Sequence, residues 1–440
     1  MNDLSATDRC VKCGLCLPHC PTFALTGNEA DSPRGRISLM QALGKNDLQW
    51  SPGLFLHLDR CLHCGACEAM CPSRVPFGRL MDTARAVIEP RRKRSLMNRL
   101  VRNTGLWLVT SPAGIRVLGK LLVVYQKTGL QSLLGWVPLL PATARRLNRL
   151  LPVMQPAGTK EAPINSSYRR RPASNSLKPL DSGIRQNDGK RINQSFPDKH
   201  RGEVGLFGSC MGSTFDQLTL SAARQLLQRL GYRVSSPARH ACCGALHQHN
   251  GAPNTARQLA DMIPGIFSDR NTPILVTASG CTAHLLDYKT LYPDTPAATF
   301  AERVSDIMHF LLESGRGDMQ FAEPEQKVAV YIPCTHRNNL KQHQDVMDVL
   351  KWIPGPEPVL INPDGGCCGA AGSYMLSQPE LSERLSNPVV ERILESGAGL
   401  VLTTNIGCSI QLQAALKQRA AAVEVLHPVV LLERLLYVVP

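Results

Sequence analysis

The stretch from Cys10 to Pro21 reads CVKCGLCLPHCP, and the stretch from Cys61 to Pro72 reads CLHCGACEAMCP. In both, three cysteines are spaced three residues apart, a fourth follows four positions later, and a proline comes next. This spacing is typical of bacterial [4Fe–4S] ligands, because three thiolates wrap one cubane and the fourth points away from the loop. Zinc sites more often use two Cys-x2-Cys pairs. The runs therefore predict two [4Fe–4S] clusters and one-electron transfer.

The assignment of ligands follows two-cluster ferredoxins, where the fourth cysteine of each run ligates the other cluster. The predicted ligands of the first cluster are Cys10, Cys13, Cys16 and Cys71. Those of the second cluster are Cys20, Cys61, Cys64 and Cys67. His19 and His63 also lie inside the runs, but the thiolate count is already complete, so we expect neither to be a ligand. The forty residues between the runs leave room for a helix around residues 37–43. A helical two-cluster ferredoxin-like domain over residues 1–80 is therefore expected, rather than a compact ββ ferredoxin.

Size and composition set further bounds. A chain of 440 residues predicts two or three domains, and a hydrophobic content of 43% supports real cores. The polar start, residues 1–8, predicts no signal peptide, and the lack of an apolar run of about eighteen residues predicts no spanning helix. Sixteen cysteines suit a reducing compartment, so a cytoplasmic location is expected.

The net charge of +14 is concentrated in the middle of the chain. Residues 81–152 hold 13 Lys and Arg against 2 Asp and Glu. Residues 81–154 are predicted to be a basic helical connector, preceded by a helix over residues 75–89. The alternative is an element that docks on a membrane surface or a partner, which Trp107 and Trp136 beside basic residues would suit.

Residues 155–202 are rich in Ser, Asn, Pro and Arg, and they predict a disordered linker. Their charge is accompanied by no helix or aromatic platform. No nucleic-acid partner is therefore expected.

Beyond residue 202 the sequence repeats itself. Two α/β halves are expected, over residues 203–320 and 321–440, with a pseudo-twofold between them. Each begins with a strand and a cysteine, continues through a helix to Cys-Cys-Gly, and ends with a strand running into another cysteine. The matching cysteines are offset by 124, 125 and 127 residues. The predicted strands are 204–208, 274–278, 328–332 and 400–404. The whole chain is thus expected to be an α+β multidomain protein.

The repeated cysteines lie at strand ends, where the sites of α/β sheets gather. The first half offers Cys210, Cys242, Cys243 and Cys281, with His284 as a further candidate ligand. The second half offers Cys334, Cys367, Cys368 and Cys408. Gln411 takes the place of His284 there and is a poor ligand for soft iron. Each set predicts an additional cluster or a zinc ion, and buried thiols without metal are the alternative.

With these motifs the chain resembles the family of glycolate oxidase iron–sulfur subunits, which are related to lactate-utilisation proteins and heterodisulfide reductase. The resemblance is carried by the two cysteine runs and five shorter stretches. These are Ser32-Pro-Arg-Gly-Arg-Ile37, His57-Leu-Asp-Arg-Cys61, Thr277-Ala-Ser-Gly-Cys281, Cys367-Cys-Gly-Ala-Ala-Gly-Ser-Tyr374 and Thr404-Asn-Ile-Gly-Cys408. It implies a separate FAD subunit that oxidises glycolate to glyoxylate, while this chain passes the electrons toward quinone. The chain has no G-x-G-x-x-G motif, which agrees with a flavin held only by the partner.

Two alternatives remain at this point. D-lactate is the nearest competing substrate. A thiol or heterodisulfide reductase acting at the Cys-Cys-Gly sites is the other. In heterodisulfide reductase these domains end in Cys-x2-Cys, whereas here the ends read Cys281-Thr-Ala-His284 and Cys408-Ser-Ile-Gln411. The missing final thiol in both halves disfavours disulfide chemistry.

Overall fold

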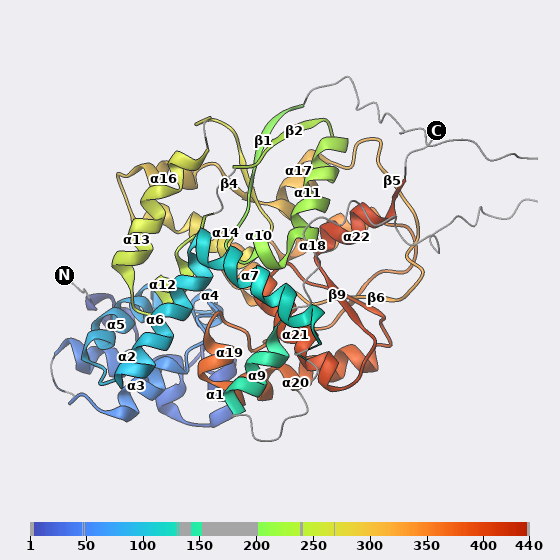
Figure 1. Ribbon diagram of the computed structural model, residues 1–440. Coiled ribbons are helices and arrows are strands. Elements are labelled where there is room, and N and C mark those ends of the chain that lie inside the picture. Colours follow the sequence, from blue (N-terminus) through green and yellow to red (C-terminus); the bar gives the residue numbers. More distant parts are fainter. Residues whose placement is uncertain are drawn as a thin grey trace, which may run out of the picture.

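The computed structural model describes residues 4–129, 131, 142–151 and 201–437, apart from residues 46, 48, 238–240 and 268 (Figure 1). The N-terminal domain is helical, and its described part holds no strand. Its helices are α1 (Pro21–Thr26), α2 (Pro33–Gly44), α3 (Pro52–Asp59), α4 (Ala66–Ala69) and α5 (Phe77–Ile88), with 3-10 turns η1 (Ser5–Arg9), η2 (Glu29–Asp31) and η3 (Glu89–Arg91). The helices expected around 37–43 and over 75–89 are α2 and α5. The predicted helical character is confirmed, and the expected domain end at residue 80 falls inside α5.

Local sequence explains where these helices start. Ser32 and Ser51 each precede a proline, and each side chain accepts a hydrogen bond from a backbone N–H in the first turn. The helices then bury one apolar face each. Met40 of α2, Leu58 of α3 and Met81 of α5 are fully buried in one shared core. This core fixes the cysteine runs, because Cys10, Cys67 and Cys71 pack against it.

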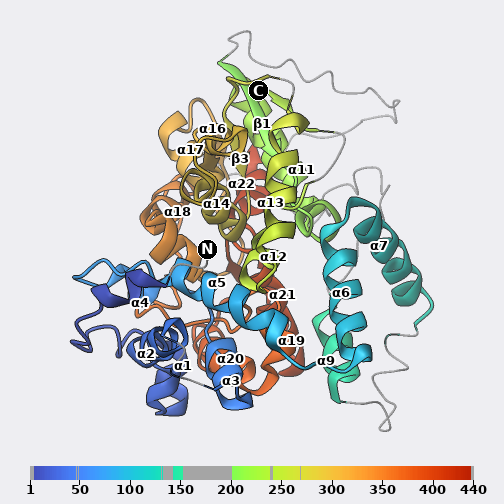
Figure 2. The same cartoon turned by 90° about the vertical axis from the view of Figure 1, so that its left-hand side faces the viewer.

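The connector consists of α6 (Leu96–Thr110), α7 (Pro112–Lys127) and α9 (Ala142–Leu150), which stand on one side of the molecule (Figure 2). The connector is helical, as expected. Residues 155–200 of the predicted linker lie outside the described residues. Gly202, the last residue of that prediction, already belongs to strand β1 (Gly202–Phe207). Trp136 is also outside the described residues. Among the described helices none is long and apolar enough alone to cross a membrane, although α6 and α7 pass that test together with a bend of 94° between them.

The two C-terminal halves have matching parallel sheets. The first sheet has the order β2-β1-β3-β4, and the second has the order β7-β6-β8-β9. The strands of the first are β1 (Gly202–Phe207), β2 (Tyr232–Ser235), β3 (Ile274–Val276) and β4 (Val304–Asp306). Those of the second are β6 (Val328–Val330), β7 (Val359–Leu360), β8 (Leu400–Leu402) and β9 (Glu424–Leu426). A short antiparallel pair, β5 (Gln320–Phe321) with β10 (Leu436–Tyr437), links the halves. The predicted duplication into two α/β halves is confirmed.

Helices and turns cover these sheets. In the first half they are α10 (Gly212–Phe215), α11 (Gln217–Arg229), α12 (Ala245–His249), α13 (Pro253–Met262), η5 (Pro264–Ile266), α14 (Ser279–Leu286), α15 (Tyr288–Leu291), α16 (Pro296–Ala301) and α17 (Ile307–Ser314). In the second they are η6 (Thr335–Leu340), α18 (His343–Leu350), α19 (Tyr374–Ser377), α20 (Pro379–Glu395), α21 (Ile406–Gln418) and α22 (Pro428–Leu435).

The halves exchange contacts reciprocally. Helix α11 of the first half packs on α22 of the second, and the equivalent α18 packs on the equivalent α17. Such reciprocity is what a twofold relation between two copies produces. One apolar core runs through both halves, with Leu206 and Leu275 on one side and Val330 and Leu402 on the other. The halves therefore form one body and fix the positions of both thiol sets.

The N-terminal domain rests on both halves. Helix α5 contacts α12 of the first half, as Figure 2 shows, while α1 contacts α20 and α4 contacts η6 of the second. The Arg85 guanidinium donates to the carbonyl oxygen of His249 at 3.0 Å, and Arg102 donates to that of Asn250 at 2.7 Å. The loop from Cys61 to Cys67 is thereby held where the three parts meet.

Candidate cluster and metal sites

The two N-terminal cysteine runs share left-handed backbone conformations at two matching positions. Lys12 and His63, at matching positions, have φ values of 57° and 56°, and Gly14 and Gly65 have values of 85° and 73°. A side chain at Gly65 would also collide with Asn339, whose Oδ1 would lie 2.6 Å from the added Cβ. Glycine here permits the left-handed turn and the close approach of a neighbour. The structure thus gives both runs the same tight loop.

The second predicted ligand set surrounds a single cavity. Cys20, Cys61, Cys64 and Cys67 all line this cavity. They come from both runs, as the crossed assignment requires. Burial raises the pKa of Cys67, and the adjoining thiols of Cys64 and Cys61 raise it further. Four thiols around one cavity fit the donor set of a cubane cluster.

The members of the first predicted set lie close by. Burial raises the pKa of Cys16, and the nearby thiols of Cys10 and Cys13 add to this effect. Cys71 packs against the same apolar core as Cys10. Cys13 is exposed, so this set lies nearer the surface than the other. The charge of Cys16 also raises the pKa of Cys67, so the two sets lie near each other.

Two guanidinium groups lie behind the second set. Burial would raise the pKa of Cys61, but the charges of Arg36, Arg85 and His63, together with the His63 backbone N–H, lower that pKa. Arg36 is only 1% exposed and pairs with Asp31 at 3.6 Å. Arg85 donates to the Cys61 carbonyl oxygen at 2.7 Å. These cations stabilise negative charge on the sulfurs.

In the first C-terminal half the structure brings all the predicted thiols together. The Cys242 thiol contacts those of Cys210 and Cys243, and Cys243 in turn contacts Cys281. The thiols of Cys242 and Cys281 lower the pKa of Cys243. The thiols of Cys210 and Cys243 raise the pKa of Cys242. His284 lies beside Cys243 and is 3% exposed. Burial lowers the pKa of His284 to about 4, so its ring is a neutral donor for metal.

The second half repeats this arrangement with sulfur alone. The Sγ atoms of Cys368 and Cys408 are 2.7 Å apart, and Cys367 contacts Cys368. Burial raises the pKa of Cys334 to about 12, with a further contribution from Cys367. Gln411 is buried here and donates to Ser386, so it does not serve as a counterpart of His284. The predicted set of four thiols is thus gathered in one buried place.

Both Cys-Cys-Gly turns are built alike. Gly244 and Gly369 have φ values of 84° and 76°, and each backbone N–H donates to the sulfur two residues earlier, at 3.4 and 3.3 Å. A Cβ at Gly369 would lie 2.3 Å from the Ser382 carbonyl oxygen. A buried tyrosine hydroxyl fixes each turn: that of Tyr288 donates to the Cys243 carbonyl, and that of Tyr331 accepts from Cys368 N–H.

The loop that carries Cys64 lies directly against the second half. The Asn338 side chain donates to the Cys64 carbonyl oxygen at 2.9 Å. Leu62 shares an apolar cluster with Cys367 and Tyr374, and Cys64 packs on it. Burial raises the pKa of Cys64, and the next causes are the thiols of Cys334 and Cys367. The second cluster cavity therefore adjoins the second-half thiols.

Sequence reasoning missed several residues of these sites. Arg85 and Asn338 lie far from their partners in the chain and carry no motif, and Arg36 lies in a stretch that carries only the family resemblance. Asp82 and His249, which meet at the domain junction, were missed as well. The arginine in Ser32-Pro-Arg-Gly-Arg-Ile37 was noticed only as part of the family resemblance. No periodicity points to these contacts, because they form only when separate domains dock.

Comparison with known proteins agrees with this organisation. Residues 6–75 match a family model described as a 4Fe-4S dicluster domain, and residues 204–286 and 328–413 match one described as a cysteine-rich domain. Residues 97–153 match the linker region of the glycolate oxidase iron-sulfur subunit.

Two relatives that match most of the chain are named as glycolate oxidase iron-sulfur subunits, and a third, which matches half of it, is named as a lactate utilization protein. A probable glycolate oxidase iron-sulfur subunit of Bacillus subtilis (strain 168) is 31% identical over 93% of this chain and 89% of that protein. The glycolate oxidase iron-sulfur subunit of Escherichia coli (strain K12) is 30% identical over 92% of this chain and 89% of its own length. Lactate utilization protein A of Shouchella clausii (strain KSM-K16) is 24% identical over 51% of this chain and 95% of its own.

Removing the Arg36 charge should change the midpoint potential of one expected cluster more than that of the other. We expect Arg36→Gln to lower the midpoint potential of the cluster held by Cys61, on the order of tens of millivolts, because less positive charge then stabilises its reduced form. Potentials would be followed by electron paramagnetic resonance during redox titration. Arg34→Gln is the matched control, since Arg34 lies beside Cys16 and Cys10 instead. Equal shifts in both variants would contradict a specific role for Arg36.

Proposed function

The chain belongs to the family of glycolate oxidase iron–sulfur subunits, and from that premise we propose that it is the electron-transfer subunit of a flavin-linked 2-hydroxy acid dehydrogenase. The substrate is glycolate. Its oxidation to glyoxylate releases two electrons and two protons to FAD on a separate subunit, and the electrons pass through this chain toward quinone in the respiratory chain. The observation that carries the proposal is the cavity ringed by Cys20, Cys61, Cys64 and Cys67 beside the second-half thiols.

Two [4Fe–4S] clusters are the proposed cofactors of the N-terminal domain, and they supply one-electron steps when bound. Cys10, Cys13, Cys16 and Cys71 hold one, and Cys20, Cys61, Cys64 and Cys67 hold the other. The protein contributes close spacing, since the charge of Cys16 reaches Cys67 and raises its pKa. It also excludes water from the inner set, since Cys20 and Cys61 are each 7% exposed. Low exposure and nearby cations are the means by which proteins adjust cluster potentials.

For the Cys-Cys-Gly halves we propose a further iron–sulfur cluster in the second half. Support comes from its four soft sulfur donors, which adjoin the Cys64 loop. In the first half a nitrogen donor, His284, joins the thiols, so zinc is the alternative occupant there. Bound metal would displace thiol protons in both halves, which offsets the cost of burying eight sulfurs.

One competing function is weaker on structural grounds. A thiol or heterodisulfide reductase must present its thiols to a disulfide substrate. Cys367, Cys368 and Cys408 are only 6%, 2% and 4% exposed, so they are shielded from such a substrate. The choice between glycolate and D-lactate is made by the partner subunit. D-lactate stays the alternative substrate, because relatives that match half of this chain are named lactate utilization proteins.

The protein is proposed to work in the cytoplasm, docked on the inner face of the membrane through α6 and α7. Residues 96–127 contain no Asp or Glu and carry five Lys and Arg. Apolar side chains at helical spacing face solvent between them, among them Leu100 and Trp107 on α6 and Leu121 and Val124 on α7, each at least 57% exposed. Positive charge beside exposed apolar groups complements an anionic lipid surface.

The complex itself is the first test of the proposal. Anaerobic purification from the native host should retain a flavoprotein with the chain, and the preparation should reduce an artificial acceptor with glycolate faster than with D-lactate. Iron, sulfide, zinc and flavin would be measured on the same sample. About eight irons correspond to the N-terminal clusters alone, and about twelve add a cluster in a Cys-Cys-Gly half. Purification without any flavoprotein would overturn the proposed role, and preference for D-lactate would replace the substrate.

A ligand variant separates electron delivery from substrate oxidation. Cys64→Ser should abolish reduction of the acceptor and leave flavin reduction by glycolate intact, because the chemistry on glycolate occurs on the partner. Stopped-flow absorbance of the flavin and steady-state acceptor reduction measure the two steps. His19→Gln is the control, as His19 lines the same cavity without being a proposed ligand. Loss of both steps in Cys64→Ser would show that the complex had collapsed instead.

Membrane docking predicts a matched pair of variants. Leu121→Glu on α7 should weaken binding to vesicles with anionic lipid by at least about tenfold, since it removes an apolar contact and adds repulsion. Met262→Glu on α13 changes a side chain of similar exposure, 59% against 63%, on another surface and should bind like the wild type. Sedimentation with vesicles gives both values. Equal binding of the two variants would assign the α6–α7 surface to a partner subunit instead.

A further inference from the structure

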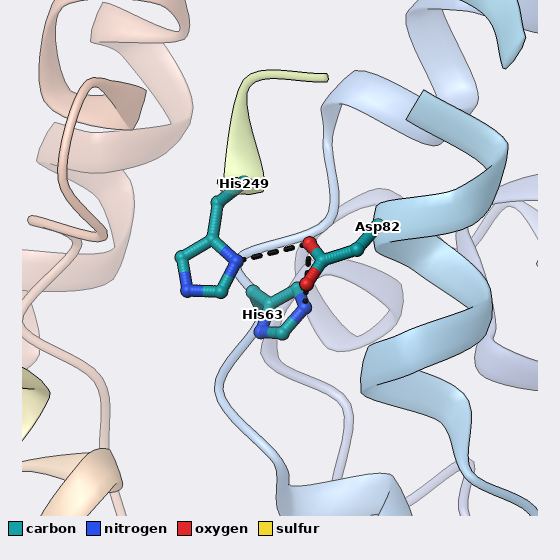
Figure 3. Close-up of side chains that lie close together, drawn as sticks. All are labelled: His63, Asp82 and His249. Atoms are coloured by element: carbon teal, nitrogen blue, oxygen red, sulfur yellow. Dashed lines mark hydrogen bonds and ion pairs between the residues drawn. The ribbon is translucent and has the colours of Figure 1, made fainter. Parts of the chain in front are cut away.

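Three side chains from separate segments converge at the junction of the N-terminal domain and the first C-terminal half (Figure 3). His63 comes from the second cysteine run, Asp82 from α5 and His249 from the end of α12. His63 Nε2 lies 3.2 Å from Asp82 Oδ1, and His249 Nδ1 lies 2.9 Å from the same oxygen. Two nitrogens and one carboxylate oxygen therefore meet within 4.8 Å of one another.

The carboxylate at the centre of this group is paired with an imidazole on each side. Asp82 is 6% exposed, and a buried carboxylate is costly unless it is paired or bound to metal. Within the described part of the chain, the only ion pairs of Asp82 within 4.0 Å are those with the two imidazoles. The Gly78 carbonyl oxygen, 3.0 Å from His63 Nε2, adds another oxygen beside the group. Oxygen and imidazole donors are thus crowded around one point.

His284 provides a second and independent observation. It is 3% exposed, and its Nε2 has no hydrogen-bond partner among the described residues. Its ring stands edge-on to that of His249, with centroids 5.6 Å apart. A buried imidazole nitrogen without a partner is uncommon, and it indicates a missing ligand. His284 adjoins both this group and Cys243.

We propose that His63, Asp82 and His249 bind a single zinc ion. Zinc binds imidazole nitrogen and carboxylate oxygen at about 2.0–2.2 Å, which places tetrahedral ligand atoms roughly 3.3 Å apart. The observed spacings of 2.9 and 3.2 Å are close to that separation.

The proposed ion would join three segments that otherwise meet only through weaker contacts. It ties the loop of Cys61 and Cys64 to α5 and to the end of α12. Arg85 already spans the same junction by donating to carbonyl oxygens of both parts. Zinc has no redox chemistry, so the site lies outside the electron path and extends the proposed function to the fixing of the domains.

Zinc analysis of the full complex tests the site. The wild type, purified anaerobically and equilibrated with micromolar zinc before desalting, should hold about one zinc per chain with a shell of nitrogen and oxygen at about 2.0–2.1 Å. Zinc-edge X-ray absorption gives this shell, and thiolate-bound zinc in the Cys-Cys-Gly halves would show sulfur at about 2.3 Å. Asp82→Asn and His249→Ala should each lose the nitrogen and oxygen shell while iron and sulfide stay unchanged.

The control keeps a similar but separate histidine. His309 pairs with Asp345 at 2.6 Å and with Glu313 at 3.3 Å, and His309→Ala should retain the zinc. If Asp82→Asn loses iron because the domain fails to fold, His249→Ala decides, since His249 is partly exposed and its backbone contacts remain. Zinc bound only through sulfur, no zinc in the wild type, or equal zinc in the wild type and His249→Ala would each overturn the proposal. None of these outcomes depends on activity with glycolate.

Discussion

The seating of the Cys61–Cys67 loop between the N-terminal domain and both C-terminal halves is the constraint on which the other sites depend. Arg85 fixes one side, because it donates to carbonyl oxygens of Leu58, Cys61 and His249 at once. Asn338 fixes the other side through the Cys64 carbonyl. A partly buried guanidinium with several charge-assisted bonds is costly to displace. The loop therefore holds thiols of different domains in one interior region.

Placing so much sulfur in one interior has an electrostatic consequence. Burial raises the pKa of Cys64, Cys67 and Cys334, so without metal these groups favour the neutral thiol. Metal needs the thiolate, and its binding must supply the free energy that deprotonation and burial cost. Arg36 and Arg85 reduce that cost on one side of the cavity. Folding, metal loading and domain docking are consequently linked in this chain.

Much of this arrangement follows from local pattern. The spacing of the cysteine runs predicts which thiols share a cavity, and Cys20 does meet Cys61, Cys64 and Cys67. Constant offsets in the second half of the chain predict two equal sheets, because a repeated sequence repeats its fold. The junction between the N-terminal domain and the first C-terminal half does not follow from local pattern. Nothing near Asp82 in the sequence marks it as the partner of His249, 167 positions away, since that contact exists only after two domains dock.

The duplicated halves are alike in fold but not in their relation to the N-terminal domain. Toward the second half, Cys64 packs on the apolar cluster that contains Cys367, and the thiols of Cys334 and Cys367 raise its pKa. Toward the first half, the path from the same loop runs through imidazoles and a carboxylate before it reaches Cys243. Soft, closely spaced sulfur suits electron transfer, whereas nitrogen and oxygen donors suit an ion that holds parts together. The replacement of His284 by Gln411 in the second half fits this division, because only the half with the imidazole path needs a nitrogen donor at that position.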